Sequence, residues 1–146
     1  MDAGVELVGE PGRVEAPSTV FLIEAAETIL VDTGFGDPER TTDAHPGFEC
    51  HRTPDRRLRR VLDDEGYAPA DVDTVVFTHL DWDHCHNLGA FGSSTEFVVQ
   101  RAELSYAADP YPPHEVRYEA GSGTGRPPWR DRDLTPIAGE TEVCPG

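Results

Sequence analysis

A strand-length apolar run that leads directly into a cluster of histidines and aspartates constrains this chain more than any other feature. The run, Thr74–Thr78, reads Thr-Val-Val-Phe-Thr, which is typical of a strand buried in a covered sheet. Four potential metal ligands follow it within six residues, namely His79, Asp81, Asp83 and His84. Strand ends in layered α/β folds open onto clefts, so we expect these side chains to line a functional site.

Imidazole and carboxylate groups together suit zinc, and also iron or manganese. In an extended segment, His79, Asp81 and Asp83 project to the same side because successive side chains alternate. The alternative is that these residues cap the following helix or bond to one another. Two histidines and two aspartates interleaved over six residues favour metal binding over that alternative.

The rest of the chain alternates between strand and helix patterns. Strands are expected at 19–23, 28–31, 74–78, 96–100 and 134–138, with the first two forming a hairpin, and helices at 54–65 and 101–108. Residues 37–54 and 109–133 show no periodicity and are expected to be loops. This alternation predicts an α/β or α+β layered sandwich, and 146 residues suit a single domain, 1–146.

Charge and cysteine usage limit the class of partner. The formal net charge is −16, with 28 acidic and 12 basic residues, which argues against binding nucleic acid or an anionic membrane through phosphates. Three cysteines make no disulfide framework, and residues 1–6 lack the apolar segment of a signal peptide. We therefore expect a cytoplasmic protein with a small-molecule substrate, while the oligomeric state stays open.

Two motifs resemble those of a known family. The segment Thr78–His84 resembles the His-x-His-x-Asp-His signature of the metallo-β-lactamase superfamily, and Ile29–Gly34 resembles the superfamily's earlier motif, whose aspartate supports the metal loop. The order and spacing of the two motifs also fit. Looser matches occur at Arg52–Pro54, Asp71–Phe77, Asn87–Gly89 and Val98–Glu103, and together they are most similar to the N-acyl-homoserine lactonase branch.

The resemblance implies an αβ/βα sandwich, of which this chain would supply the N-terminal αβ half. It also implies that His79 and position 81 bind a first metal ion and that Asp83 and His84 bind a second, so that one or two zinc ions are expected. Asp83 would further act in catalysis by orienting the attacking hydroxide. Asp32 would orient a ligand through a hydrogen bond, although an aspartate in an ordinary turn before a glycine is the alternative.

This sequence departs from the family pattern in two places. Asp81 stands where the family usually has histidine, which makes that site harder and shifts metal choice towards manganese or iron. His86, where the family commonly has a small residue, is either a further ligand or, as we prefer, a residue at the start of a helix. The segment Thr141–Gly146 resembles the stretch before the family's next metal-binding histidine, so we expect an N-terminal fragment.

As to function, the resemblance implies a metal-dependent hydrolase in which metal-bound hydroxide attacks an ester or lactone carbonyl, with an N-acyl-homoserine lactone as the best candidate. The alternatives are a thioester or phosphodiester substrate, or a truncated fragment that binds metal without catalysis. Cys85 lies between two histidines, but no third partner group is evident, so a cysteine nucleophile is not expected. No residue is singled out for substrate binding.

Overall fold

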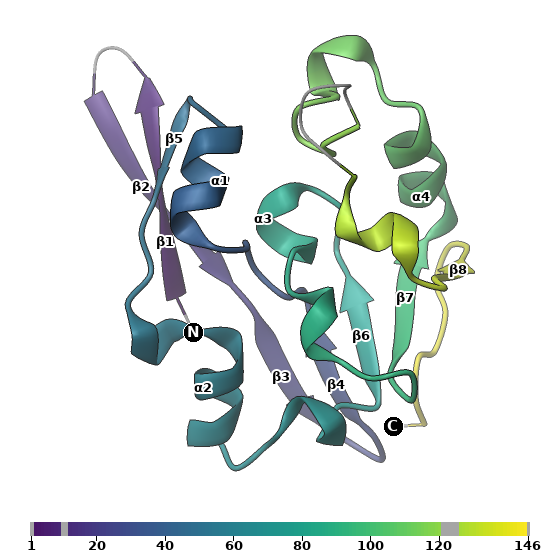
Figure 1. Ribbon diagram of the computed structural model, residues 1–146. Helices are drawn as coiled ribbons and strands as arrows, with labels where there is room; N and C mark the ends of the chain where they lie inside the picture. Colours follow the sequence, from purple (N-terminus) through teal and green to yellow (C-terminus); the bar gives the residue numbers. More distant parts are fainter. Residues whose placement is uncertain (1, 10–11, 121–125, 146) are drawn as a thin grey trace.

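The computed structural model describes residues 2–9, 12–120 and 126–145, which form two sheets and a set of short helices (Figure 1). The larger sheet has the strand order β3-β4-β6-β7-β8. Its strands are β3 (Phe21–Glu24), β4 (Thr28–Val31), β6 (Thr74–Phe77), β7 (Glu96–Gln100) and β8 (Thr135–Ile137). β3 pairs with β4 as an antiparallel hairpin and the other pairs are parallel, which confirms the predicted hairpin and strands.

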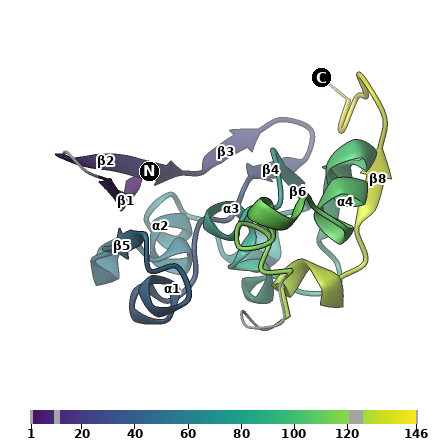
Figure 2. The ribbon, with the colours of Figure 1, turned by 90° about the horizontal axis from the view of Figure 1, so that it is seen from above.

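The helices lie on one side of this sheet (Figure 2). The α-helices are α1 (Pro38–Ala44), α2 (Leu58–Asp64), α3 (Trp82–Cys85) and α4 (Arg101–Ala108). The parallel strands follow one another in order across the sheet, so right-handed crossovers place α2, α3 and α4 on the same side. Figure 2 shows α1, α2 and α3 together on one side of the sheet. The structure thus confirms the predicted layered α+β architecture.

The core lies between this sheet and the helices. Alternate strand residues point into it, and the buried ones include Leu30, Val75, Phe77, Phe97 and Val99. The intervening residues of β3 point to the opposite face, where Phe21 and Ile23 are 61% and 45% exposed. Because Phe21 pairs with Val31, which pairs with Val76, an apolar row runs across that face. Both faces of the sheet are therefore apolar, as the continuous apolar runs predict.

The expectation of a loop over residues 37–54 was wrong. This stretch contains α1 and β5 (Phe48–Cys50), which joins β1 (Asp2–Gly9) and β2 (Gly12–Thr19) in a second sheet of order β2-β1-β5. Asp37 caps α1 by accepting a hydrogen bond from the backbone of Arg40 (3.2 Å). A seven-residue helix and a three-residue strand are too short for periodicity to reveal, and β5 depends on pairing with a distant strand.

Single turns of 3-10 helix complete the described chain. They lie at Pro54–Arg56, Pro69–Asp71, Leu88–Ala90, Pro112–His114 and Pro128–Asp131. The described parts of the expected loop 109–133 pack onto the body through Tyr118 and Trp129, which are buried. Within the described residues, no helix reaches the length and apolar character needed to cross a membrane.

Candidate metal centre

Asp32 lies in the loop that follows β4, and its carboxylate forms hydrogen bonds with the loop that follows the neighbouring parallel strand β6. Its Oδ1 accepts a hydrogen bond from the backbone of Thr78 (2.9 Å), and its Oδ2 accepts one from the Thr78 hydroxyl (2.7 Å). The same Oδ2 lies 2.8 Å from Nδ1 of His84. Asp32 has φ of 60°, a left-handed conformation that a residue other than glycine keeps only when its surroundings impose it. The structure thus places Asp32 against a predicted ligand, in position to orient it.

Three of the four predicted ligands meet at one point. One side-chain donor atom from each of His79, Asp83 and His84 lies within 4.8 Å of the others. Thr78 donates its hydroxyl proton to Asp32, so the same oxygen is free to accept from Nδ1 of His79, 2.9 Å away. Both histidines therefore use Nδ1 for these contacts, and Nε2 of each faces a carboxylate, Asp81 at 3.7 Å from His79 and Asp83 at 3.4 Å from His84, so that a metal ion would lie among Nε2 atoms and carboxylate oxygens.

Asp81 does not join this group of donor atoms. Its Oδ2 accepts hydrogen bonds from Nε (2.7 Å) and Nη2 (2.5 Å) of Arg117 and lies 3.7 Å from Nε2 of His79. Its Oδ1 is buried and has no hydrogen-bond partner among the described residues. An unpartnered buried carboxylate oxygen is costly, and a cation beside it would remove that cost. This orphaned oxygen and the imidazole and carboxylate donors fit a divalent cation.

Hydrogen bonds dominate the ionisation of the cluster. Burial favours the neutral form of His84, but hydrogen bonds with Asp32 and Asp83 outweigh it and raise the pKa of His84 to about 10. Burial raises the pKa of Asp83, but the hydrogen bond with His84 and the positive charges of His84 and His79 together outweigh that effect, so the pKa falls below its usual value. In the metal-free protein, His84 is therefore a cation held between two carboxylates, where a metal cation would replace its proton.

The loop after β4 holds α3, which carries Asp83 and His84. The backbone N–H of Thr33 (2.7 Å) and its hydroxyl (3.0 Å) both donate to the carbonyl of His84, and Ser18 donates to the carbonyl of Asp83 (2.9 Å). Arg52 supports the same loop by donating to the carbonyls of residues 35 and 36 at 2.8 and 2.6 Å. These contacts give the looser motif at Arg52 a structural role.

Gly36 lies against His86, the residue directly after α3, and a substitution there tests this contact. A Cβ at Gly36 would lie 2.7 Å from Nδ1 of His86, whose ring cannot swing away freely because its Nε2 lies 2.7 Å from Glu119. We expect Gly36→Ala to lower the free energy of unfolding by about 1–3 kcal/mol, as overpacking does. Chemical denaturation measures the loss. Gly89→Ala is the matched control, because its Cβ would meet nothing within 4 Å, and an equal loss in both variants would contradict the prediction.

Sequence reasoning missed two residues near the centre, Arg117 and Glu119. Arg117 binds Asp81, while Glu119 binds His86 through Oε2 (2.7 Å) and His45 through Oε1 (3.1 Å). Both lie in the stretch without periodicity, and no sequence signal could have singled them out. His86 is thus engaged by Glu119 and does not belong to the group of three donor residues.

Cys85 and Cys50 are both buried thiols. Cys85 is buried and donates its thiol to the carbonyl of Leu80 (3.4 Å), and burial raises the pKa of Cys85 well above its ordinary value. Burial likewise raises the pKa of Cys50. A thiol that stays protonated is a poor nucleophile, which agrees with the expectation that Cys85 does not act as one.

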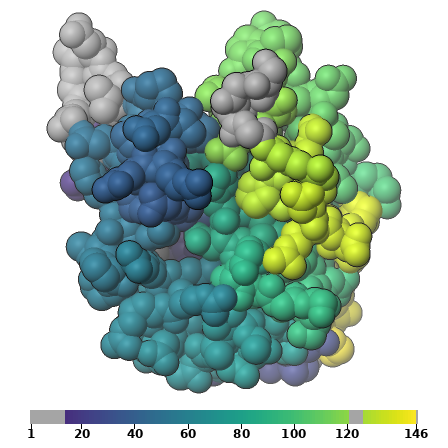
Figure 3. All heavy atoms as spheres, viewed as in Figure 1, coloured from purple at the N-terminus to yellow at the C-terminus, as the bar shows by residue number. Residues whose placement is uncertain are grey.

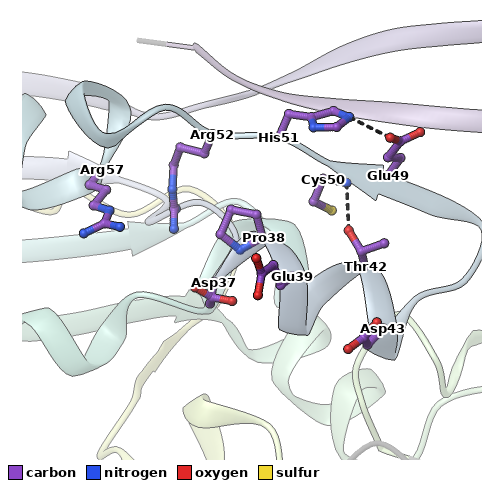
Figure 4. Close-up of a pocket in the computed structure, with 10 residues that line it drawn as sticks. All are labelled: Asp37, Pro38, Glu39, Thr42, Asp43, Glu49, Cys50, His51, Arg52 and Arg57. Atoms are coloured by element: carbon purple, nitrogen blue, oxygen red, sulfur yellow. Dashed lines mark hydrogen bonds and ion pairs between the residues drawn. The ribbon is translucent and has the colours of Figure 1, made fainter.

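A separate cavity of about 1030 Å³ lies beside α1 (Figure 4). Its lining mixes acidic and basic side chains, including Glu39, Glu49, Arg52 and Arg57, and Figure 4 shows Thr42 bonded to the backbone of Cys50 at its wall. None of the three clustered donor residues lines it. Figure 3 shows a different hollow, between α1 and the segment after α4.

Comparison with known proteins agrees with this architecture. The family model described as the metallo-beta-lactamase superfamily matches residues 13–145. An N-acyl homoserine lactonase from Bacillus cereus is 34% identical over 108 residues, which cover 66% of this chain and 42% of that protein. The chain thus matches less than half the length of this curated relative.

Comparison with solved structures also agrees with this fold. A crystal structure of a quorum-quenching N-acyl homoserine lactone hydrolase is 25% identical, with a TM-score of 0.69, and the match covers 99% of this chain and 58% of that one. An N-acyl homoserine lactone hydrolase with N-hexanoyl-L-homoserine bound at its catalytic metal centre is 24% identical, with a TM-score of 0.70 and coverage of 99% and 60%. With the family model matching nearly all of its residues, the chain belongs to the metallo-β-lactamase superfamily.

Proposed function

We propose that this protein is a metal-dependent hydrolase that opens the ester bond of a lactone, with N-acyl-homoserine lactones as its substrate class. The observation that carries the proposal is the convergence of donor atoms from His79, Asp83 and His84 within 4.8 Å, beside the carboxyl ends of the parallel strands β4 and β6. We propose that these residues hold the cation, that Asp81 adds its unpartnered Oδ1, and that Asp32 orients both histidines.

Zinc is the proposed metal because two imidazoles and a carboxylate form a typical catalytic zinc set; the carboxylate of Asp81 makes manganese or iron the alternative. When bound, such a cation polarises a carbonyl oxygen and lowers the pKa of water to about 7. The protein's own contribution is orientation. Asp83, whose lowered pKa keeps it ionised, accepts a hydrogen bond from the attacking water and directs that water at the carbonyl carbon.

The lactone substrate is supported by the curated relatives that carry the name N-acyl homoserine lactonase. A thioester or phosphodiester would also suit a cation-assisted hydrolase, since one fold hosts many chemistries. A chain that binds the cation without turnover is the remaining alternative. We further propose that residues 1–146 belong to one domain and act in the cytoplasm on a small molecule.

Zinc content tests the proposal directly. We expect the purified chain, after dialysis against zinc, to retain at least one ion per molecule by elemental analysis, and the variant His79→Ala/His84→Ala to retain none. Asp63→Asn, which removes an exposed carboxylate outside the cluster, serves as the control and should bind zinc normally. Equal zinc in the parent chain and the double variant would overturn the assignment of the site.

Turnover is measured separately, as acid released from N-hexanoyl-homoserine lactone. Hydrolysis by the zinc-loaded chain, reduced about 100-fold or more in Asp83→Asn, supports the enzyme. Zinc binding without hydrolysis of this lactone contradicts the lactone substrate, and hydrolysis of neither a thioester nor a phosphodiester by the same sample would then support the non-catalytic alternative.

A further inference from the structure

Two of the three clustered donor residues, Asp83 and His84, lie on α3, which is a single helical turn of four residues. A helix this short is unstable alone, because nucleation costs more than one turn of hydrogen bonds returns. The direction in which α3 presents its ligands must therefore be imposed by neighbouring segments. Figure 1 shows α3 between α1 and the segment that follows α4, and residues 117–119 of that segment contact both ends of α3.

Arg117 forms hydrogen bonds at the N-terminal end of α3. Asp81 is the residue before α3, and Arg117 binds its Oδ2 through two nitrogens at 2.7 and 2.5 Å. The carbonyl of Arg117 also accepts a hydrogen bond from the backbone of Trp82 (2.9 Å), the first residue of α3. One residue thus satisfies both a carboxylate and a backbone donor at the start of the helix.

Glu119 forms a hydrogen bond at the C-terminal end of α3. Its Oε2 lies 2.7 Å from Nε2 of His86, the residue directly after α3. Its Oε1 lies 3.1 Å from Nε2 of His45, and the ring of His45 stacks on Trp82 at 4.4 Å between centroids. Glu119 is buried and has φ of 51°, so its surroundings keep it in a conformation that a non-glycine residue rarely adopts.

Tyr118 ties the same segment to the body of the protein. Its side chain is buried in the main core and contacts the ring of Tyr106 edge-on, with 5.8 Å between centroids. The segment Arg117–Glu119 is therefore fixed to the core by the apolar packing of Tyr118. The charged side chains of Arg117 and Glu119 contact the two ends of α3.

We infer that Arg117 and Glu119 are positioning residues that set the orientation of α3 and hence the geometry of the metal-binding side chains. The metal part of this inference rests on the proposed function, whereas the control of α3 itself does not. Arg117 also offsets the negative charge of Asp81 beside Asp83, which leaves Oδ1 of Asp81 as the oxygen free to face a cation.

The test compares Arg117→Gln and Glu119→Gln with two controls that lie outside the segment but close to it in the sequence. Arg126→Gln removes an arginine whose ion pair with Asp131 is exposed, and Glu115→Gln removes a carboxylate four residues from Glu119. Zinc affinity is measured by competition with a chelator, and hydrogen exchange of amides 82–86 is measured without metal. We expect each test variant to bind zinc about 10- to 100-fold more weakly and to exchange faster at 82–86, with both controls unchanged. Arg117→Lys, which keeps the charge, should recover part of the zinc affinity.

The outcomes separate this inference from the proposed function. If the parent chain binds no zinc, the proposed function fails, and faster exchange at 82–86 in the two test variants still supports the positioning role. Unchanged exchange at 82–86 in both variants overturns the inference, whether or not the parent binds zinc. A general rise in exchange across β6 and β7 together with α3 would also overturn it, because it would show a merely structural role.

Discussion

Asp32→Asn should weaken zinc binding about 10- to 100-fold, because Asp32 aligns both histidines of the cluster. Its carboxylate contacts His84 directly and reaches His79 through the hydroxyl of Thr78. Asparagine keeps the left-handed backbone of Asp32 accessible and can still accept from Thr78, but it lacks the charge that pairs with His84. Chelator competition measures the loss in zinc affinity.

The same substitution should lower stability in the metal-free protein. Asp32 is buried, and its loss as an anion leaves the cationic His84 with Asp83 as its remaining partner among the described residues. Breaking a buried ion pair from one side costs about 3–5 kcal/mol, which corresponds to a fall in Tm of about 10–20 °C for a chain of this length. Asp37→Asn is the control, because Asp37 accepts a hydrogen bond on an exposed helix end. Zinc affinity equal to that of the parent chain would show that Asp32 does not orient the ligands.

Zinc affinity should rise about tenfold for each unit of pH between 6.5 and 8.5. Hydrogen bonds with Asp32 and Asp83 outweigh burial and hold the pKa of His84 near 10, so a zinc ion at His84 must displace a proton throughout this range. Calorimetry in buffers of different ionisation enthalpy should show one proton released per ion from this residue. Asp32→Asn should flatten the pH dependence, because it removes one of the two carboxylates that retain the proton. Affinity independent of pH, with no proton release, would contradict the role of His84 as a ligand.

Stability without metal should respond to pH in the opposite direction. A histidine whose folded pKa lies above its unfolded value of about 6.5 stabilises the fold fully below that pH. This contribution is lost as the pH rises through about 10. The metal-free chain is therefore expected to lose stability on the alkaline side, where zinc binding is tightest.

The strands and the ligand motif could be predicted because local pattern determines them. A run such as Val75–Phe77 is apolar at every position, and its short length and β-branched residues favour a strand in a covered sheet. The histidines and aspartates directly after it, together with Asp32 after β4, share an edge because neighbouring parallel strands end there. The placement of Asp32, His79, Asp83 and His84 therefore follows from sequence and topology together.

Other elements could not be predicted, because their stability comes from distant partners. β1, β2 and β5 form a sheet through pairings such as that of residues 5–7 with 48–50, and α1 rests on a cap and a few contacts. No local apolar period marks these segments, so residues 37–54 were expected to be a loop.

What the sequence by itself determined is the set of candidate donor residues, since the residue types of the motif and its position after a buried strand define which atoms are able to bind a cation. What only the tertiary structure decided is how those atoms are held. Asp81 is turned to Arg117, and His86 to Glu119, by a segment more than 30 residues away in the chain. Local propensity cannot encode such contacts, because they form only when core packing brings the segment of Tyr118 against a one-turn helix that cannot orient itself.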